Sequence, residues 1–488
     1  MATTWDHDVA IVGGGMSGIC MGVALDRRGI RDFVILEKSA DVGGTWLDNS
    51  YPGACCDVPS VLYSFSFAPN PDWSRKYSPQ PEIQSYFSRC LDQFGLRQRL
   101  RTNAAVAAAR YLDAEGGWEL TLKDGATLRV RAVVSALGQL NLPNIPLFAG
   151  ADSFSGEQFH SARWRHDIDL TGKRVAVIGN AASALQFIPH VARQAAQLHV
   201  YQRTANHVIP RNDRAFREWE KTLFRRFPFT QKLARLFIYL RQDGLLYPLM
   251  RGSRPHRWLV ERLARWNLER HIIDPRRRTQ LWPDYVIGCK RVLVSDDYYQ
   301  TFNRPKVELV TSSIRGIGRE GVLTEDGVER PVDVIIYGTG FRATEMLSAV
   351  DFRGRGGQAL AETWREGAEA YRGIACHGFP NLFILYGPNT NLGSSSIIYM
   401  VEQQSRYIAR LIQKLLKHEL TSLEPSRTAQ QTYNDRLQGE LAGTVWASEC
   451  DSWYKNAAGR IVLNWPRSTT YYRWHMRSPD FVDYELGA

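Results

Sequence analysis

The sequence predicts an α/β fold with two Rossmann-like dinucleotide-binding domains and a helical insertion. A strand–turn–helix–strand pattern with a glycine-rich turn opens the chain, and the same pattern begins again near residue 175. Between residues 211 and 280 this rhythm is replaced by arginine and aromatic residues at helical spacing. At 488 residues, with 44% hydrophobic and 23% charged residues, the chain has the size and composition of a globular protein of two or three domains.

The first unit lies between residues 9 and 37. Residues 9–12 are typical of a buried parallel strand, residues 19–28 suit a helix, and Phe33–Leu36 suit a second strand. The first turn has the spacing G-x-G-x-x-G, which permits a tight turn, backbone contact with a pyrophosphate at the helix N-terminus, and close helix packing. The alternative is an ordinary glycine-rich turn. The residues of this predicted site are Gly13, Gly15, Gly18 and Glu37, whose carboxylate suits a ribose diol.

The second unit has strands at residues 175–178 and 198–201. Gly13 and Glu37 are 24 residues apart, and so are Gly179 and Arg203. The residue 24 positions after the first glycine is thus an acid, Glu37, in the first unit and a base, Arg203, in the second. A carboxylate repels a 2′-phosphate, whereas a guanidinium can chelate one. The first unit therefore predicts FAD or an NAD-like ribose, and the second predicts NADPH. Two dinucleotides in one chain imply electron transfer between them. The second turn has Ala181 where a glycine is usual, and its methyl group is expected to loosen or displace NADPH.

The loop of residues 39–80 carries the motif GGTWLDNSYPGACCD, which is rich in turn residues and aromatics. Long loops in compact enzymes are usually functional, so we expect this motif to contact the ligand of the first unit. Asp57 precedes Val-Pro and therefore lies in extended or turn backbone; a helix cap or turn aspartate is the alternative. The candidate residues in this loop are Gly44, Thr45, Trp46 and Asp57.

Later apolar runs also end in glycine-rich loops. A predicted strand at 132–136 ends at Gly138, a strand within 331–337 leads to Gly340, and the loop with Asn391 precedes a helix from about residue 397. Backbone N–H groups in such loops suit flavin oxygens at a helix start. The predicted domains are an FAD-binding domain of residues 1–145 and 335–488, an NADP-binding domain of residues 146–210 and 281–334, and a helical insertion of residues 211–280.

The insertion holds much of the excess positive charge of a chain with net charge +11. No nucleic-acid motif accompanies this charge, so we interpret it mainly as a solvated helical face and expect no nucleic-acid partner. Three interpretations of the insertion stay open: a lid over a substrate channel, a structural helical subdomain, and a helix at a membrane surface.

Seven cysteines, with no C-x-x-C and no metal-like spacing, predict reduced thiols in a cytosolic protein without a metal site. The first strand begins about eight residues into the chain, too early for a signal peptide, and no apolar run approaches the 18 residues of a membrane span. A cytoplasmic location is therefore expected. The cysteines are Cys20, Cys55, Cys56, Cys90, Cys289, Cys376 and Cys450.

The segment FSGEQFHSARW resembles the fingerprint F-x-G-x-x-x-H-x-x-x-W of type I Baeyer–Villiger monooxygenases, a branch of the class B flavoprotein monooxygenases. The residues that match are Phe154, Gly156, His160 and Trp164. The family has Pro or Asp at the next position, where this chain has Arg165. The related N- and S-oxygenating enzymes usually have Tyr or Phe in place of Trp164, so the resemblance favours the Baeyer–Villiger branch.

The resemblance covers nearly the whole chain and implies an FAD domain, an NADP domain and a helical insertion. It implies that Arg291 and Asp57 lie near the flavin and that Trp453 belongs to a mobile loop over the nicotinamide. Lys290, by the same resemblance, faces the 2′-phosphate together with Arg203. The NADPH-binding residues expected in the second unit are Gly179, Ser183, Arg203, Thr204 and Lys290.

The implied reaction passes hydride from NADPH to FAD, and the reduced flavin takes up O₂ to form a C4a-peroxide that converts ketones to esters or lactones. A fixed cation at Arg291 keeps the peroxide deprotonated and stabilises the developing oxyanion, while Asp57 holds the guanidinium. His160 is expected to be structural or to gate the linker; a neutral core histidine is the alternative.

Two other functions are weighed against this one. An N- or S-oxygenating monooxygenase, or an uncoupled NADPH oxidase, needs the same cofactors but takes a soft nitrogen or sulfur nucleophile, or no substrate, in place of a ketone. A catalytically silent nucleotide-binding redox sensor belongs to a different class, and only Ala181 and Arg165 favour it.

Overall fold

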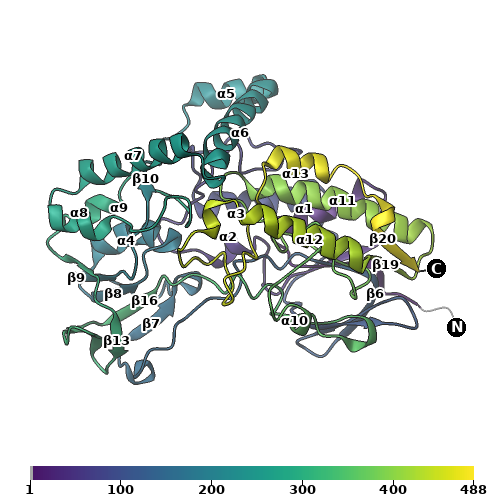
Figure 1. Ribbon diagram of the computed structural model, residues 1–488, viewed down its shortest axis with the longest axis horizontal. Coiled ribbons are helices and arrows are strands. Elements are labelled where there is room, and N and C mark those ends of the chain that lie inside the picture. The colour runs from purple at the N-terminus through teal and green to yellow at the C-terminus, as the bar shows by residue number, and fades with distance from the viewer. Residues whose placement is uncertain (1–3, 488) are drawn as a thin grey trace.

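Two sheets built mainly from parallel strands organise the chain, seen here in a computed structural model that describes residues 4–487 (Figure 1). The larger sheet carries the N-terminal turn, and the smaller sheet carries the repeated turn. The α/β fold with two Rossmann-like units and a helical insertion, predicted from the sequence, is confirmed.

The larger sheet has eight strands in the order β17-β4-β5-β6-β1-β2-β3, with β18 paired to β6. Its central strand β1 is parallel to both β2 and β6, and Val9, Ala10 and Ile11 have no exposed surface because helices cover the sheet. The strands are β1 (His7–Val12), β2 (Phe33–Leu36), β3 (Leu100–Arg101), β4 (Val106–Leu112), β5 (Gly117–Leu122), β6 (Thr127–Ser135), β17 (Asp351–Arg353) and β18 (Leu382–Ile384).

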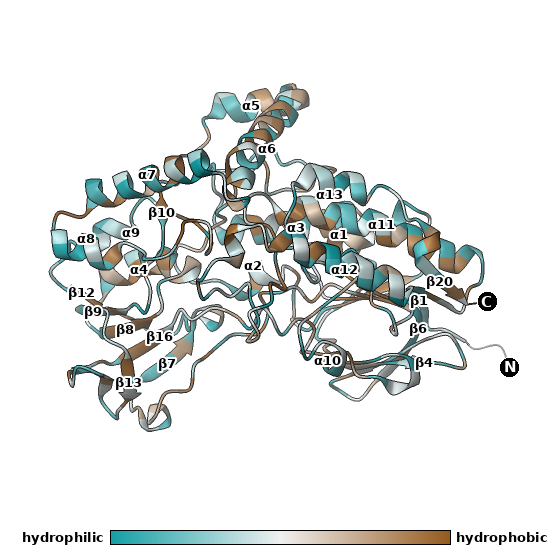
Figure 2. Ribbon diagram, in the orientation of Figure 1, coloured by the Kyte–Doolittle hydropathy of each residue, from teal (hydrophilic) through white to brown (hydrophobic). Residues whose placement is uncertain are grey.

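The smaller sheet has five parallel strands in the order β12-β9-β8-β16-β7. Its inner strands are apolar, and Figure 2 shows β8 and β9 in brown. The strands are β7 (Glu157–His160), β8 (Arg174–Ile178), β9 (Gln197–Tyr201), β12 (Val307–Val310) and β16 (Val334–Tyr337). Three small sheets join β10 (Val208–Ile209) to β11 (Leu293–Val294), β13 (Ile314–Ile317) to β14 (Gly321–Thr324) and β15 (Glu329–Pro331), and β19 (Ser422–Pro425) to β20 (Tyr484–Gly487).

Two helices begin directly after the glycine-rich turns. The first, α1 (Met16–Asp26), begins three residues earlier than the sequence pattern predicts, so Gly18 lies inside its first turn. Its counterpart in the second unit is α4 (Ala182–Gln194). The other helices outside the insertion are α2 (Thr45–Asp48), α3 (Gln80–Gln93), α9 (Tyr298–Thr301), α10 (Leu360–Thr363), α11 (Ile397–Lys417), α12 (Arg427–Leu441) and α13 (Thr469–His475).

The chain crosses between the two units twice, after β6 and after β16. These crossings lie side by side: Asn144 N donates to Gly340 O at 2.9 Å, and Arg342 N donates to Leu142 O at 2.9 Å. The units are therefore joined by a two-stranded connection, and the space between them is bounded by both linkers.

The insertion is helical and consists of α5 (Glu218–Arg226), α6 (Pro228–Met250), α7 (Arg254–His271) and α8 (Pro275–Leu281). Helices α5 and α6 rise above the rest of the molecule, while α7 and α8 cover the second unit (Figure 1).

The prediction that the cysteines are reduced is wrong for one pair, because Cys289 and Cys450 form a disulfide. These residues are 161 positions apart, and the fold brings their Cα atoms within 6.5 Å, a separation at which a disulfide closes without backbone movement. Sequence spacing contains no signal for such a pairing. Five cysteines are free: Cys20, Cys55, Cys56, Cys90 and Cys376.

Candidate functional site

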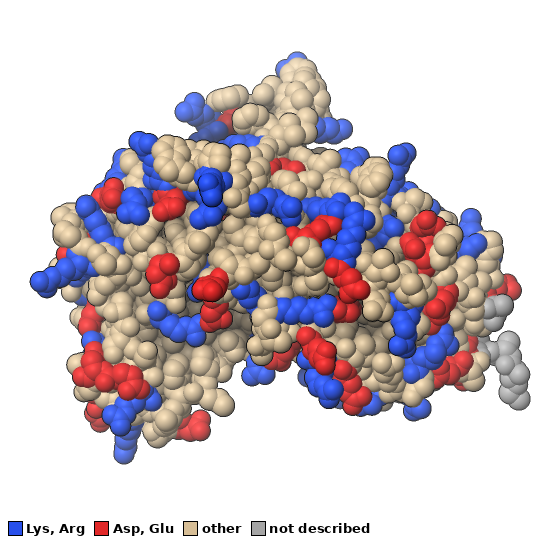
Figure 3. All heavy atoms as spheres, viewed as in Figure 1, with Lys and Arg blue, Asp and Glu red and all other residues tan. Residues whose placement is uncertain are grey.

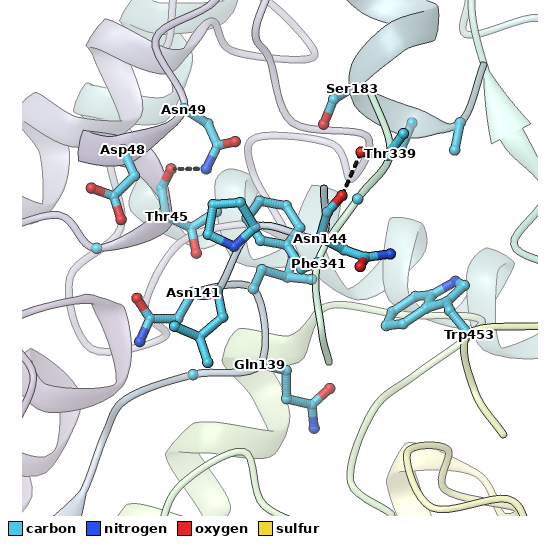
Figure 4. A pocket seen from close by; sticks show the side chains of 18 of the residues that line it. Thr45, Asp48, Asn49, Gln139, Asn141, Asn144, Ser183, Thr339, Phe341 and Trp453 are labelled. Atoms are coloured by element: carbon cyan, nitrogen blue, oxygen red, sulfur yellow. Dashed lines mark hydrogen bonds between the residues drawn. The ribbon is translucent and has the colours of Figure 1, made fainter. Parts of the chain in front are cut away.

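A cavity of about 1610 Å³ lies between the two units and is bounded by both linkers. Sites for a single small ligand usually measure about 300–1,000 Å³, so this cavity has room for two. Figure 4 shows Thr45 of the first unit and Ser183 of the second on different sides of it, with Trp453 near its edge. The predicted residues that line it are Gly13, Gly15, Glu37, Gly44, Thr45, Trp46, Asp57, Gly138, Gly179, Ser183, Arg203, Thr204, Lys290, Arg291, Gly340, Asn391 and Trp453.

The two glycine-rich turns have the same geometry. Gly13 has φ +116° and Gly179 has φ +106°, and a Cβ atom would lie 2.6 Å from Ala136 O at the first and 2.4 Å from Gly338 O at the second. Each turn is therefore pressed against the end of the neighbouring strand, where only glycine fits. A Cβ at Gly18 would lie 1.9 Å from Gly13 O, so this glycine serves helix packing and does not line the cavity.

Helices α1 and α4 both start at the cavity without a side-chain cap. Their N-cap residues are Gly15 and Ala181, and no side chain accepts a hydrogen bond from the first N–H groups of either helix. Uncapped N–H groups at a helix start suit phosphate oxygens. A Cβ at Gly15 would lie 3.4 Å from Gly44 Cα, so the motif loop closes tightly over the first turn. Both starts fit the pyrophosphate of a dinucleotide.

Buried polar atoms on the cavity wall also fit polar ligands. Gln139 Oε1, Ser395 Oγ and Ser452 Oγ are buried and have no hydrogen-bond partner among residues 4–487. Buried polar groups are normally paired, so these atoms indicate a bound group with complementary donors or acceptors. FAD and NADPH both carry such groups, and the residues present therefore fit them.

Glu37 lies at the end of β2 and is 3% exposed. Its Oε2 accepts a hydrogen bond from Gly14 N at 2.7 Å and its Oε1 accepts one from Ser39 N at 2.8 Å. These bonds fix the carboxylate at the cavity wall, and each oxygen retains acceptor capacity for a ribose hydroxyl.

Arg291 and Asp57 meet at the cavity although they are 234 residues apart. Asp57 Oδ2 accepts from Arg291 Nε at 2.8 Å and lies 2.6 Å from Arg291 Nη2. The carboxylate raises the pKa of Arg291 further, so the guanidinium stays charged. Both side chains are only about one-third exposed, at 31% and 30%. Near them, burial raises the pKa of Tyr454 to about 12, which leaves that phenol neutral.

Arg203 and Lys290 both line the cavity, and their two positive charges are close enough to interact. Burial and then the nearby Arg203 lower the pKa of Lys290. Asp451 was not predicted from the sequence; its Oδ2 lies 3.4 Å from Arg203 Nη2. Both side chains of that pair are more than four-fifths exposed, so the contact is weak and open to a competing phosphate. Proximity to Trp453 in sequence is the one signal that pointed to Asp451.

Trp453 lies close to the Cys289–Cys450 disulfide, which connects its segment to another part of the cavity wall. Cys450 precedes it by three residues, and Cys289 directly precedes Lys290 and Arg291. The Trp453 ring is 38% exposed and lies 4.7 Å from the Tyr454 ring. The disulfide therefore joins two cavity-lining segments directly.

Other predicted residues use their side chains within the protein. The Asn391 amide donates to Asn464 Oδ1 at 2.8 Å and accepts from the Tyr386 hydroxyl at 2.7 Å, which ties the loop before α11 to the C-terminal segment. Trp46 Nε1 donates to the Tyr63 hydroxyl at 3.0 Å. These residues shape the cavity wall and leave mainly backbone and ring faces for a ligand.

The fingerprint residues do not line the cavity. A Cβ at Gly156 would lie 2.4 Å from Asp333 O, and Phe154 is buried, so both serve packing around β7. His160 is 2% exposed, its Nδ1 accepts from Ala162 N at 3.1 Å, and burial lowers its pKa. Trp164 packs against Phe187 at a ring distance of 5.3 Å.

The YPG part of the motif loop joins the two units, a role that the sequence analysis missed. The Tyr51 ring packs 5.7 Å from the Phe187 ring of α4, and its hydroxyl donates to Gln186 Oε1 at 3.0 Å. A Cβ at Gly53 would lie 2.6 Å from His190 Nε2 and 2.8 Å from Gln186 O. The signal available in the sequence was the Tyr-Pro-Gly turn itself.

The two departures from the family pattern differ in position. Arg165 is exposed, pairs with Asp167 at 2.6 Å and does not line the cavity. Ala181 lines the cavity and is exposed to it at the start of α4. Only Ala181 therefore lies where it can contact a ligand.

The chain matches proteins of known family over most of its length. A family model described as "Flavin-binding monooxygenase-like" matches residues 6–348. A protein named "Baeyer-Villiger monooxygenase" from Streptomyces coelicolor is 42% identical over 483 residues, covering 98% of this chain and 92% of the relative. The crystal structure "OTEMO complex with FAD and NADP" has TM-score 0.88 and 29% identity, covering 99% of this chain and all of the other. The closed crystal structure of cyclohexanone monooxygenase has TM-score 0.89 and 28% identity, covering both chains fully.

No helix within residues 4–487 is both long and apolar enough to cross a bilayer.

Proposed function

The chain belongs to the flavin-binding monooxygenase-like family, and from this premise we propose that it is an FAD- and NADPH-dependent Baeyer–Villiger monooxygenase. It inserts one oxygen atom of O₂ between the carbonyl carbon of a ketone and a neighbouring carbon, giving an ester or lactone. FAD occupies the first unit and the adjoining C-terminal segment, and NADPH occupies the second unit. When bound, the two cofactors supply the reduction and activation of O₂.

The chain's own residues orient both cofactors and stabilise charge. The N-terminal turns of α1 and α4 hold the two pyrophosphates, Glu37 holds a ribose, and Arg203 with Lys290 holds the 2′-phosphate. Arg291 stays protonated and stabilises negative charge that develops on the substrate carbonyl oxygen. Asp57 fixes the direction of that guanidinium through two contacts to one carboxylate oxygen.

The segment around Trp453 excludes water from the reacting centre, because the disulfide holds it against the Lys290–Arg291 segment. A buried neutral His160 takes no part in proton transfer and supports the linker through its packing near Phe341, at a ring distance of 5.8 Å.

The observation that supports this proposal most is the Arg291–Asp57 pair in a cavity that both glycine-rich turns share. The experiment is turnover of the FAD-loaded protein with NADPH, a panel of ketones and a sulfide under isotopically heavy O₂. We expect esters that carry one heavy oxygen atom. Sulfoxide as the only oxygenated product indicates an S-oxygenating enzyme, and hydrogen peroxide without product indicates an NADPH oxidase; either result refutes the proposal.

A further inference from the structure

The positive charge of the chain is concentrated in the insertion. Residues 211–280 contain 18 Lys and Arg and 7 Asp and Glu, so this segment alone carries a net charge of +11. The whole chain also has a net charge of +11, and the rest of the sequence is balanced, with 43 basic and 43 acidic residues. A segment that carries the entire charge excess favours a negatively charged partner.

The same segment holds most of the exposed large apolar side chains. Among residues 4–487, 20 large hydrophobic side chains are exposed, and 12 of them lie between residues 219 and 266. We name these the apolar ridge; they are Trp219, Leu223, Phe227, Phe229, Leu233, Leu236, Phe237, Leu240, Trp258, Leu259, Leu263 and Trp266. Exposed apolar side chains concentrated in one segment mark an interaction site.

Helix α6 turns one apolar face of its N-terminal half to solvent, whereas Leu249 and Met250 at its C-terminal end are buried in the core. Phe229, Leu233, Leu236, Phe237 and Leu240 recur at i, i+4, i+7, i+8 and i+11 and so form one face, and each of them is at least 50% exposed. A globular protein normally turns such a face towards its core. Here the face is unpartnered within residues 4–487.

Polar contacts on the opposite side of α6 fix this orientation. Gln231 Nε2 donates to Asn70 O at 2.6 Å, and Arg235 Nη1 donates to Val61 O at 3.0 Å and to Ser64 O at 2.8 Å. Gln231 is 4% exposed, so these bonds lie within the packed interface with the first unit. The apolar face therefore cannot turn inward without breaking several buried hydrogen bonds.

Arginine side chains border the ridge and stack on its tryptophans. The Arg262 guanidinium lies 5.2 Å from the Trp258 ring, and the Arg270 guanidinium lies 5.1 Å from the Trp266 ring. On α7 the exposed Leu259, Leu263 and Trp266 share one face, and the buried residues lie on the other. Aromatic and aliphatic side chains with arginine at their edges are the composition of helices that lie in a lipid interface.

We propose that α5, α6 and α7 form a docking surface for an anionic phospholipid bilayer. The apolar ridge enters the headgroup region, and the surrounding lysines and arginines contact lipid phosphates. The α5–α6 hairpin projects from the body (Figure 1), and its visible surface in Figure 3 is mainly uncharged, with Lys and Arg side chains at its edges. A projecting surface can enter a bilayer directly, whereas a protein partner would need a groove that matches it. A second copy of the chain is disfavoured, because the contact brings two segments of net charge +11 together.

The test is co-sedimentation of the FAD-loaded, full-length protein with vesicles of phosphatidylcholine, with and without phosphatidylglycerol, at low and high sodium chloride. We expect binding to vesicles with phosphatidylglycerol that weakens as salt rises. The double variant Phe237→Glu/Leu240→Glu should lower the partition coefficient at least about tenfold, since it removes two apolar side chains and adds two negative charges.

The matched control is Leu147→Glu/Val482→Glu, which makes the same charge change at side chains 102% and 90% exposed outside the insertion. It should retain binding. Thermal unfolding and flavin content of both variants confirm that they fold. Absence of vesicle binding at low salt overturns the proposal, and so does equal loss in both variants. Concentration-dependent dimers that Phe237→Glu/Leu240→Glu abolishes, without vesicle binding, assign the ridge to self-association instead.

Discussion

Replacing Arg291 with alanine separates oxygen transfer from NADPH oxidation. The guanidinium is the cation that the proposed reaction places beside the substrate carbonyl, and Asp57 holds it at 2.6 Å. Loss of one preorganised group that stabilises an oxyanion lowers the rate about 10²–10³-fold. We therefore expect ester formation by Arg291→Ala to fall by that factor, while NADPH oxidation falls much less and hydrogen peroxide accumulates.

The partner carboxylate should have a smaller effect. Two unit charges about 4 Å apart interact by about 4 kcal/mol at an effective dielectric constant of about 20. Because both side chains are about one-third exposed, at 31% and 30%, we halve this value to about 2 kcal/mol. This free energy sets the upper limit for the cost of a misdirected guanidinium, so we expect ester formation in Asp57→Asn to fall by up to about 30-fold, since 1.36 kcal/mol is a factor of ten.

The assay measures ester, hydrogen peroxide and NADPH consumed in the same reaction, with flavin content and thermal unfolding as checks on folding. Arg165→Ala is the matched control, because that arginine is exposed and does not line the cavity. Arg291→Lys keeps the positive charge and should recover part of the ester yield. The proposed role of Arg291 is refuted if Arg291→Ala forms ester at a rate within about tenfold of the wild type, or if ester formation falls more in Asp57→Asn than in Arg291→Ala.

Four further predictions concern the contact between the two units, a buried histidine, the disulfide and the binding of NADPH. Gly53→Ala should lower the free energy of unfolding by at least about 2 kcal/mol, because its Cβ would meet the backbone of the second unit at 2.8 Å. Gly29→Ala, which has a similar positive φ but no neighbour within 4 Å, should lose only about 1 kcal/mol in the same denaturant titration. Burial lowers the pKa of His207 to about 4, below the unfolded value of about 6.5. The unfolded state therefore takes up the proton first, and the free energy of unfolding should fall by about 3 kcal/mol from pH 6.5 to pH 4, a slope that His207→Phe reduces. Cys450→Ser should lower the free energy of unfolding by about 2–4 kcal/mol and raise the KM for NADPH, because it frees the Trp453 segment. Arg203→Ala should raise the KM for NADPH about tenfold and leave the KM for NADH unchanged.

Each of these predictions has a result that contradicts it. If Gly53→Ala and Gly29→Ala lower the free energy of unfolding equally, the positive φ alone accounts for the loss. If the free energy of unfolding of His207→Phe falls with decreasing pH as steeply as that of the wild type, other groups cause the acid sensitivity. Alkylation and mass spectrometry should find five reactive cysteines in the unfolded wild type before reduction and seven after it, and seven before reduction would exclude the disulfide. A parallel rise of KM for NADH in Arg203→Ala would place the side chain away from the 2′-phosphate.

Local chemistry explains why much of the site was predictable. Strand β2 spans the predicted residues Phe33–Leu36, because a short apolar run between polar turns has few alternatives. The turns at Gly13 and Gly179 combine a positive φ with a close backbone contact. Only glycine satisfies both conditions, so the sequence marks these turns clearly. The start of α1 was misplaced by three residues because a glycine at a helix start gives no side-chain cap to mark it.

The sequence by itself determined the two glycine-rich turns, the change from Glu37 to Arg203 at equal spacing from those turns, and the helical character of the insertion. These features depend on residue type and spacing within about 30 residues. Only the tertiary structure decided that Arg291 lies against Asp57, that Cys289 bonds to Cys450, and that the apolar face of α6 points outward. Periodicity defines which residues share a face, but the packing of distant segments determines what that face meets.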